Sequence, residues 1–224
     1  MTLAYASPPP QTWRLIPSHF PPIGAFDTVS TAADLEAVME LEGWTNDRLV
    51  VERLGRLPQS EWVFGVLNAS VIMAAFLHAA PSGGRFNGPE LGAWYAGAAL
   101  NTAIAEVAHH LRREAVARSL SETRRVFRCY SSKLLGDDYV DLRGLRADRP
   151  DLYAPLDYTA SQAFGENTRA SNKSGITYDS LRYAGGTNVV GFHPLQVTEV
   201  TQTEHYDILA PVHGKIVVMR LTTS

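Results

Sequence analysis

The sequence of 224 residues contains a single cysteine, Cys129. One cysteine excludes an internal disulfide and every metal or redox site built on a pair of cysteines. It suits a reducing compartment, so we expect a cytoplasmic protein in which Cys129 is a small core residue. The opening residues, MTLAYASPPPQTW, contain neither a basic segment nor an apolar one, so they do not resemble a signal peptide.

A strong net charge is also missing, since the formal charge is −3 and the pI is near 6.2. This excludes the uniformly basic surface of many proteins that bind nucleic acid or anionic lipid, and we expect neither partner. Six arginines do cluster, and we interpret them as a solvated helix face followed by a strand. They are Arg112, Arg113, Arg118, Arg124, Arg125 and Arg128.

No uninterrupted apolar segment is long enough to cross a membrane. The most apolar run, WVFGVLNASVIMAAFLHAA at 62–80, is broken by Gly65, Asn68, Ser70 and His78. Few membrane spans carry so many polar groups. This run therefore predicts a buried strand or loop that leads into a core helix.

Common catalytic motifs are absent as well. There is no GxGxxG after a strand, no GxxxxGK[ST], no HExxH and no GxSxG, which disfavours a dinucleotide fold of the Rossmann type and a P-loop. Glu106 and His109 have the Glu-x-x-His spacing of carboxylate-bridged metal sites, but such sites need a second copy of the motif. No second copy is evident, so we expect no metal.

The chain predicts an α+β fold in which helices flank a small mixed β core within one domain. Residues 1–11 are rich in proline and predict a mobile lead-in, and 12–224 form the domain. Hydrophobic periodicity, caps and turn residues predict the following elements. Helices are expected at 30–43, 68–80, 100–119 and 159–172; an extended connector at 20–26; and strands at 12–16, 92–97, 124–135, 175–183, 187–194, 196–209 and 214–221.

An arginine, a tyrosine and a glutamate, Arg85, Tyr95 and Glu106, are spaced through the stretch GGRFNGPELGAWYAGAALNTAIAEV at 83–107, which is mostly small and apolar. Arg85 follows a Gly–Gly pair, and its planar fork suits a diphosphate or a carboxylate, although an ordinary loop arginine has the same signature. Tyr95 suits stacking on a ring or simple core packing. Glu106 lies about 120° from the apolar centre of its helix, among small residues, so it is either a pocket carboxylate or a surface glutamate.

Four ordered segments, GGRFN, WYAG, TAIAEV and SGITYDSLRYAGGTNVVGF, resemble the RES domain. The family is named for an arginine, a glutamate and a serine, which correspond to Arg85, Glu106 and Ser180, and Tyr95 corresponds to the usual fourth member. WRLIPSHFPPIGAFD and MAAFLHAAPSGGRF resemble the longer, ParT-like members. The resemblance covers most of 12–220, but the stretch between Arg14 and Arg85 is longer than in compact members.

The resemblance implies the toxin half of a toxin–antitoxin pair, with a core similar to the diphtheria-toxin-like ADP-ribosyltransferases. Such proteins break the nicotinamide–ribose bond of NAD and pass ADP-ribose to a protein side chain, to phosphate or to water. A protein acceptor is our first expectation, with phosphoribosyl pyrophosphate synthetase as the candidate implied by the longer members. The implied partner is an Xre-family antitoxin that blocks the cleft. A non-catalytic module that holds a nucleotide or a partner is the alternative of another class.

The resemblance also implies a role for each residue. Glu106 would bind a ribose hydroxyl and stabilise the positive charge that grows on the sugar as the bond breaks. Tyr95 would stack on nicotinamide or ribose, and Arg85, together with Arg14, would bind the pyrophosphate. Ser180 would donate a hydrogen bond to a phosphate or to the carboxamide. From composition alone, the favoured interpretation is an ordinary turn serine before a strand.

Overall fold

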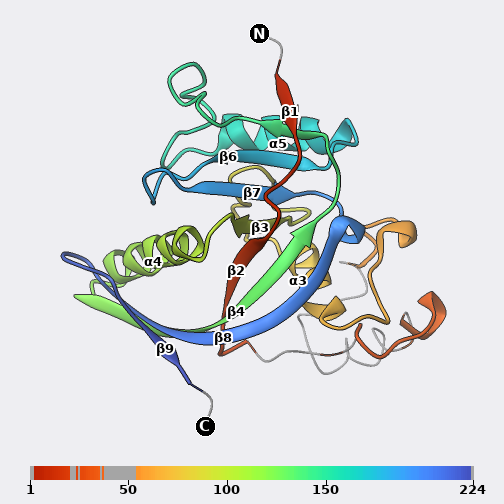
Figure 1. Ribbon diagram of the computed structural model, residues 1–224, viewed down its shortest axis with the longest axis horizontal. Coiled ribbons are helices and arrows are strands. Elements are labelled where there is room, and N and C mark those ends of the chain that lie inside the picture. Colours follow the sequence, from red (N-terminus) through yellow and green to blue (C-terminus); the bar gives the residue numbers. More distant parts are fainter. Residues whose placement is uncertain (1–2, 21–23, 25, 36, 38–53, 223–224) are drawn as a thin grey trace.

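The computed structural model describes residues 3–20, 24, 26–35, 37 and 54–222. Within them, nine strands form one sheet, against which helices α3, α4 and α5 pack (Figure 1). The strands are β1 (Ala4–Ala6), β2 (Thr12–Pro17), β3 (Trp94–Gly97), β4 (Glu122–Leu134), β5 (Tyr139–Asp141), β6 (Gly175–Asp179), β7 (Thr187–Gly191), β8 (Val197–Pro211) and β9 (Val217–Leu221). The helices are α3 (Ala69–Leu77), α4 (Leu100–Ala117) and α5 (Thr159–Ala170), with 3₁₀ turns η1 (Gln59–Glu61) and η2 (Pro194–Gln196).

The strand order is β1-β5-β6-β7-β3-β2-β4-β8-β9, and neighbouring strands run antiparallel except for β5 and β6. Neighbours in the sheet are often distant in the sequence, and helices and strands do not alternate regularly. This arrangement confirms the predicted α+β class, although nine strands make a larger sheet than the small β core that was expected.

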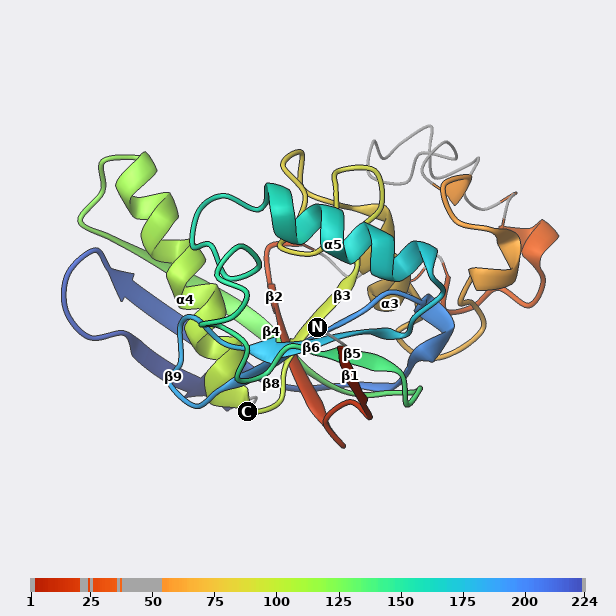
Figure 2. The same ribbon diagram turned by 90° about the horizontal axis from the view of Figure 1, so that it is seen from above.

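The sheet opens between β2 and β3. In the described part of the chain these two strands pair through one residue couple, Trp13 with Gly97, whereas β2 pairs with β4 along its whole length from Thr12 to Pro17. Figure 2 shows β2 and β3 diverging below the helices. A sheet that splits in this way leaves backbone groups and side chains facing the gap, and it is here that the polar residues of the sequence meet.

Helix α4 lies along one wall of this gap and packs against β2, β4 and β8. Its buried side chains are small apart from Leu111, so the helix lies close to the strands; they are Thr102, Ala103, Ala108, Leu111 and Ala115. The helix ends at Ala117, where Ser119 adopts a positive φ of 55° and the Leu120 amide donates to the Ala115 carbonyl. This is a Schellman-type end, in which the helix cannot continue in the same direction.

Helices α5 and α3 support the other parts of the sheet. Phe164 of α5 packs with Ile176 and Tyr178 of β6, and α3 buries Ile72 and Phe76 against strand residues that include Trp94. In Figure 2, α4 lies toward the left of the molecule, and α5 and α3 both lie to the right of it.

Most predicted elements are confirmed, with shifted ends. The strands expected at 12–16, 92–97 and 124–135 correspond to β2, β3 and β4, and the four later ones to β6 through β9. Cys129 is fully buried, as expected. The helix expected at 68–80 ends earlier, at Leu77. His78 already has non-helical dihedral angles, with φ −115° and ψ 62°.

Two strands were not predicted. β1 and β5 are three residues each, too short to show a clear alternation. β1 pairs with β5, so the segment expected to be a mobile lead-in contains a strand that is held in the sheet by backbone hydrogen bonds.

Two further predictions concern the first third of the chain. Of the helix expected at 30–43, residues 32–35 are helical and most of the remainder lies outside the described residues. The apolar run at 62–80 folds as a loop and helix α3, as expected. Among the helices that the structure describes, none is both long and apolar enough to cross a bilayer.

Candidate active site

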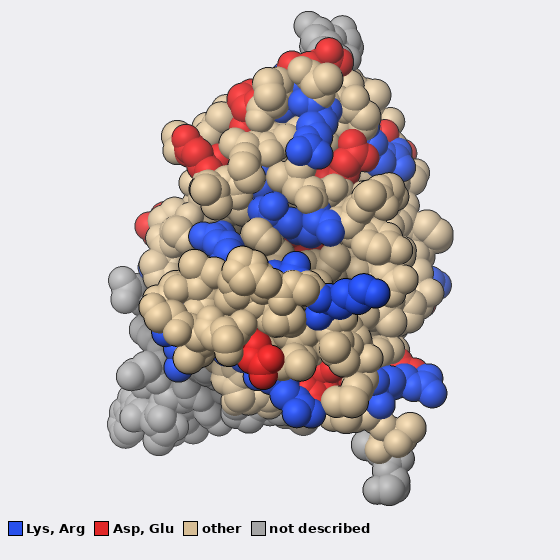
Figure 3. Space-filling view, turned by 90° about the vertical axis from the view of Figure 1, so that its left-hand side faces the viewer, with Lys and Arg blue, Asp and Glu red and all other residues tan. Residues whose placement is uncertain are grey.

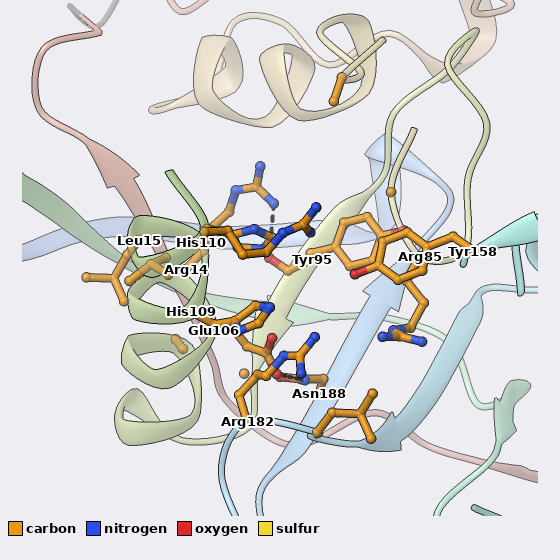
Figure 4. A pocket seen from close by; sticks show the side chains of 18 of the residues that line it. Arg14, Leu15, Arg85, Tyr95, Glu106, His109, His110, Tyr158, Arg182 and Asn188 are labelled. Carbon is orange, nitrogen blue, oxygen red and sulfur yellow. Dashed lines mark hydrogen bonds between the residues drawn. The ribbon is translucent and has the colours of Figure 1, made fainter. Parts of the chain in front are cut away.

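A cleft with a volume of about 640 Å³ occupies the gap between β2 and β3 and is bounded by α4 (Figure 4). This volume falls within the roughly 300–1,000 Å³ typical of small-molecule sites. The polar and aromatic side chains that line it are Trp13, Arg14, Ser82, Arg85, Tyr95, Glu106, His109, His110, Arg113, Glu114, Tyr158, Tyr178, Arg182 and Asn188. Four of the five predicted site residues therefore meet in one cavity, and Ser180 lies directly behind it.

Glu106 lies on α4 and is fixed in the cleft by two hydrogen bonds. The Ser180 hydroxyl and the Asn188 amide each donate to the same oxygen, Glu106 Oε1, and each bond is 2.7 Å long. The second oxygen, Oε2, has no hydrogen-bond partner among the described residues. Glu106 is thus a pocket carboxylate with one oxygen held and one available to a ligand, which settles the alternative left open by the sequence.

Ser180 is placed to orient Glu106. Its hydroxyl oxygen also accepts hydrogen bonds from the backbone amides of Arg182 and Tyr183, both at 3.1 Å. With these two donors directed at the oxygen, its hydrogen points to Glu106. The side chain is 9% exposed and does not line the cleft. The predicted contact between Ser180 and a ligand remains a prediction; the contact present is with the carboxylate.

Tyr95 presents its ring to the cleft, while its hydroxyl holds the preceding loop. The hydroxyl accepts from the Phe86 amide at 2.8 Å and donates to Asn87 Oδ1 at 2.7 Å. Burial raises the pKa of Tyr95 above its usual range, so the phenol stays protonated. A Cβ on Gly84 would lie 2.7 Å from the Tyr95 hydroxyl oxygen, which explains the need for glycine there.

Arg85 is held on the opposite wall from Arg14. Its Nη1 donates to the carbonyls of Leu152 and Ala154, both at 3.0 Å, and its guanidinium carbon lies 4.6 Å from the centre of the Tyr158 ring. Within the described residues, Nε and Nη2 have no hydrogen-bond partner. The fork is therefore fixed by the protein on one edge and open to an anion on the other.

Arg14 bridges the two strands that diverge at the split. From β2 its Nη1 donates to the Tyr95 carbonyl of β3 at 3.0 Å, and its guanidinium carbon lies 4.9 Å from the Trp94 ring centre. The Arg14 guanidinium therefore takes the place of the β2 backbone amide that would bind this carbonyl if the β2–β3 ladder were continuous. Burial lowers the pKa of Arg14 to about 10, which still leaves it charged at neutral pH.

Sequence reasoning missed Asn188, Tyr158, Tyr178 and Arg182. Asn188 is a buried amide that directly precedes the apolar residues VVG of its strand, and that contrast was a usable signal. Tyr158 and Tyr178 carried none, because tyrosines before a helix or within a strand are common in cores. Arg182 follows the serine segment, and its position near Glu106 depends on the turn after β6 (Figure 4).

His109 also faces the cleft. Burial, reinforced by Arg182 and neighbouring cations, lowers its pKa from 6.5 to about 4, so the imidazole is neutral at pH 7. Its Nε2 is buried and has no hydrogen-bond partner in the described part of the chain. Glu106 and His109, whose spacing suggested a metal site, belong to no group of three possible metal ligands within the described residues.

The cleft is electrostatically positive. Four arginines line it, against two glutamates, and Glu114 is already paired with Arg118 and Arg125. Figure 3 shows basic side chains gathered across the middle of the face that forms the left-hand side of Figure 1. A bound anion would find several cations and a surface with few acids nearby.

Three comparisons with known proteins indicate what the chain is similar to. A family model described as the RES domain matches residues 53–210. No curated protein sequence matches the chain significantly. Among solved structures, a similar chain occurs in the crystal structure of the M. tuberculosis MbcT–MbcA toxin–antitoxin complex, with 15% sequence identity, 91% of this chain and 86% of that chain covered, and a TM-score of 0.47.

Proposed function

The chain belongs to the RES domain family, and we propose that it is a toxin that consumes NAD by breaking the bond between nicotinamide and ribose. One observation carries this proposal: the Glu106 carboxylate is oriented through one oxygen by Ser180 and Asn188 while the other oxygen remains available in a cationic cleft. An anchored carboxylate of this kind is preorganised to stabilise a developing positive charge.

Breaking this bond requires a carboxylate beside the ribose but no strong general acid. The bond that breaks joins ribose C1′ to the nicotinamide nitrogen, and its electron pair leaves with nicotinamide, which becomes neutral. The ribose gains oxocarbenium character, as in glycoside hydrolysis. Glu106 Oε2 would accept a hydrogen bond from the adjacent ribose hydroxyl and stabilise this charge. An acceptor then forms a new bond to C1′ from its own lone pair, and any proton it carries goes to solvent.

Substrate binding is assigned to the arginines and tyrosines of the cleft. The open edge of Arg85 suits one phosphate of the pyrophosphate, and Arg14, on the other wall, adds a second positive charge. The Tyr95 ring offers a stacking surface for the nicotinamide or the ribose. A dinucleotide with two negative charges fits this distribution better than a neutral ligand does.

We propose a protein side chain as the acceptor, with phosphoribosyl pyrophosphate synthetase as the candidate that the ParT-like segments imply. Phosphate and water are the alternative acceptors, and each gives a different product. We also propose an Xre-family antitoxin that covers the cleft, because a toxin that consumes NAD must be held silent in the cell that makes it.

The proposed function is tested by incubating the purified protein with NAD labelled in its adenylate half. Three reactions are compared: buffer alone, buffer with phosphate, and buffer with bacterial lysate. Label on a protein band supports a protein acceptor, a phosphorylated ADP-ribose supports phosphate, and free ADP-ribose supports water. Intact NAD in all three reactions, together with normal growth of cells that express the chain alone, would show a non-catalytic module.

A further inference from the structure

One face of α5 lies along the loop that carries Arg85. We call residues 82–92 the Arg85 loop; it connects α3 to β3 and has no regular secondary structure. Four residues of α5 lie three or four positions apart along the helix and so occupy one of its faces: Gln162, Gly165, Glu166 and Arg169. All four contact the backbone of the loop.

Gln162 contacts the loop on both sides of Gly83. Its Nε2 donates to the Ser82 carbonyl at 2.7 Å and to the Gly84 carbonyl at 2.9 Å. Gly83 has a positive φ of 71°, and a Cβ there would lie 2.7 Å from Gln162 Nε2. One amide group therefore fixes the carbonyls of Ser82 and Gly84, on either side of a glycine that the turn needs for both its conformation and its space.

The rest of the same face holds the remainder of the loop. Glu166 Oε1 accepts from the Gly88 amide at 2.7 Å, and Arg169 Nη2 donates to the Gly92 carbonyl at 2.7 Å. Between Gln162 and Glu166, Gly165 lets the helix approach so closely that a Cβ would lie 2.0 Å from the Phe86 carbonyl oxygen. Glycine inside a helix is unfavourable, so its presence here indicates that close approach is required.

The end of α5 that is nearest the cleft completes the arrangement. Tyr158 immediately precedes the helix, and the guanidinium of Arg85 stacks on its ring. Arg85 is thus fixed by the segment that leads into α5 while its own loop is fixed by the helix. An irregular loop needs such partners for its backbone groups.

We propose that Gln162, Gly165, Glu166 and Arg169 form a clamp, the α5 clamp, that fixes the Arg85 loop in the conformation that binds the substrate diphosphate. Within it, Gln162 is a positioning residue that acts through Arg85 and does not touch the substrate. This rests on the proposed function, because it assigns the diphosphate to Arg85. The part that concerns the loop itself can be measured without NAD.

The test uses Gln162→Ala and Gln162→Glu in the full chain. Gln162→Glu keeps the shape of the side chain but directs a carboxylate at two carbonyl oxygens, so it should be worse than Gln162→Ala; simple packing predicts the reverse. Gln162→Lys, which restores an N–H donor, should recover part of the loss. Asn167→Ala, on the exposed side of the same helix, is the matched control.

Two measurements are made on each variant. Hydrogen exchange should become faster at the amides of the Arg85 loop in Gln162→Glu, while the β4 and β8 amides and the midpoint of thermal unfolding stay as in the control. The KM for NAD in nicotinamide release should rise roughly tenfold, the effect of weakening binding by about 1.4 kcal/mol, with kcat within about threefold.

Unchanged exchange in the Arg85 loop of Gln162→Glu would overturn the clamp. Faster exchange with an unchanged KM would overturn the positioning role. If the wild-type chain does not turn over NAD, the proposed function fails, and the exchange measurement still decides whether the clamp exists.

Discussion

The Ser180 hydroxyl donates a 2.7 Å hydrogen bond to Glu106 Oε1 across a separation of 74 residues in the chain. The serine follows β6 and the glutamate lies on α4, so the bond joins the two walls behind the cleft. The third partner, Asn188 of β7, donates to the same oxygen. Glu106 is therefore oriented by the sheet and presented by the helix.

Ser180→Ala should lower kcat for nicotinamide release and leave KM nearly unchanged. Losing one hydrogen bond to a charged group costs about 1.5–3 kcal/mol, which corresponds to roughly 10- to 100-fold in rate. Asn188→Ala should behave in the same way, and the double variant should lose less than the product of the two effects, because both residues act on one oxygen. Ser171→Ala, at the exposed end of α5, is the control. A raised KM with an unchanged kcat would instead show that Ser180 contacts the substrate directly.

Arg85→Ala should weaken both binding and turnover, because a diphosphate contact exists in the ground state as well as in the transition state. Arg85→Lys should resemble Arg85→Ala more than wild type, since an ammonium cannot serve the Leu152 and Ala154 carbonyls and a phosphate with one planar fork. Isothermal titration with NAD in a Glu106→Gln background measures the binding alone. Arg146→Ala, at an exposed position, is the control. If Arg85→Ala bound NAD with the same affinity as Arg146→Ala, Arg85 would be excluded from the binding site.

Arg14→Met should destabilise the fold as well as reduce NAD binding. The Tyr95 carbonyl at the split would lose its partner, and an unsatisfied buried carbonyl costs about 1–3 kcal/mol. Urea denaturation of Arg14→Met and wild type measures the loss. Equal midpoints and equal slopes would contradict the role of Arg14 as the bridge between β2 and β3.

His109 should make folding less stable as the pH falls from about 6.5 to 4. Its folded pKa, about 4, lies below the unfolded value of 6.5, so in this window the unfolded chain binds a proton that the folded chain does not. Stability then decreases with falling pH. Carboxylates with lowered pKa, such as Asp207, act in the same direction, so the informative quantity is the difference from His109→Gln. His109→Gln should flatten the pH dependence in this window. Identical curves for wild type and His109→Gln would contradict the neutral state of the imidazole in the folded protein.

Caps and periodicity predicted the long elements, and the RES-like segments predicted four of the residues that line the cleft, Arg14, Arg85, Tyr95 and Glu106, because all of these signals are read along the chain. The orientation of α4 was less well predicted. The helical periodicity placed its apolar centre near Leu100, Ile104, Val107 and Leu111. Leu111 is buried, but the other three are half-buried, and the buried positions include Thr102 and Ala108. A helix that packs closely against strands buries its small residues, and hydrophobicity alone does not report that.

Contacts between distant elements could not be predicted from local patterns. The two donors to Glu106 come from the end of β6 and from β7, and their convergence depends on the strand order. Arg128, one of the six clustered arginines, is 7% exposed, and its side chain donates to the Phe20 carbonyl. In both cases a polar group is buried because another backbone or side-chain group across the fold satisfies it.

The most direct test of the proposed mechanism is the rate of nicotinamide release from NAD by the purified wild-type chain and by Glu106→Gln. If Glu106 stabilises positive charge only in the transition state, the variant should bind NAD with unchanged affinity and lose about 10²–10³ in rate, the usual cost of removing one preorganised electrostatic contact. The substitution is nearly isosteric, so the free energy of unfolding should change by less than about 1 kcal/mol. A folded Glu106→Gln protein that releases nicotinamide at the wild-type rate would contradict the mechanism.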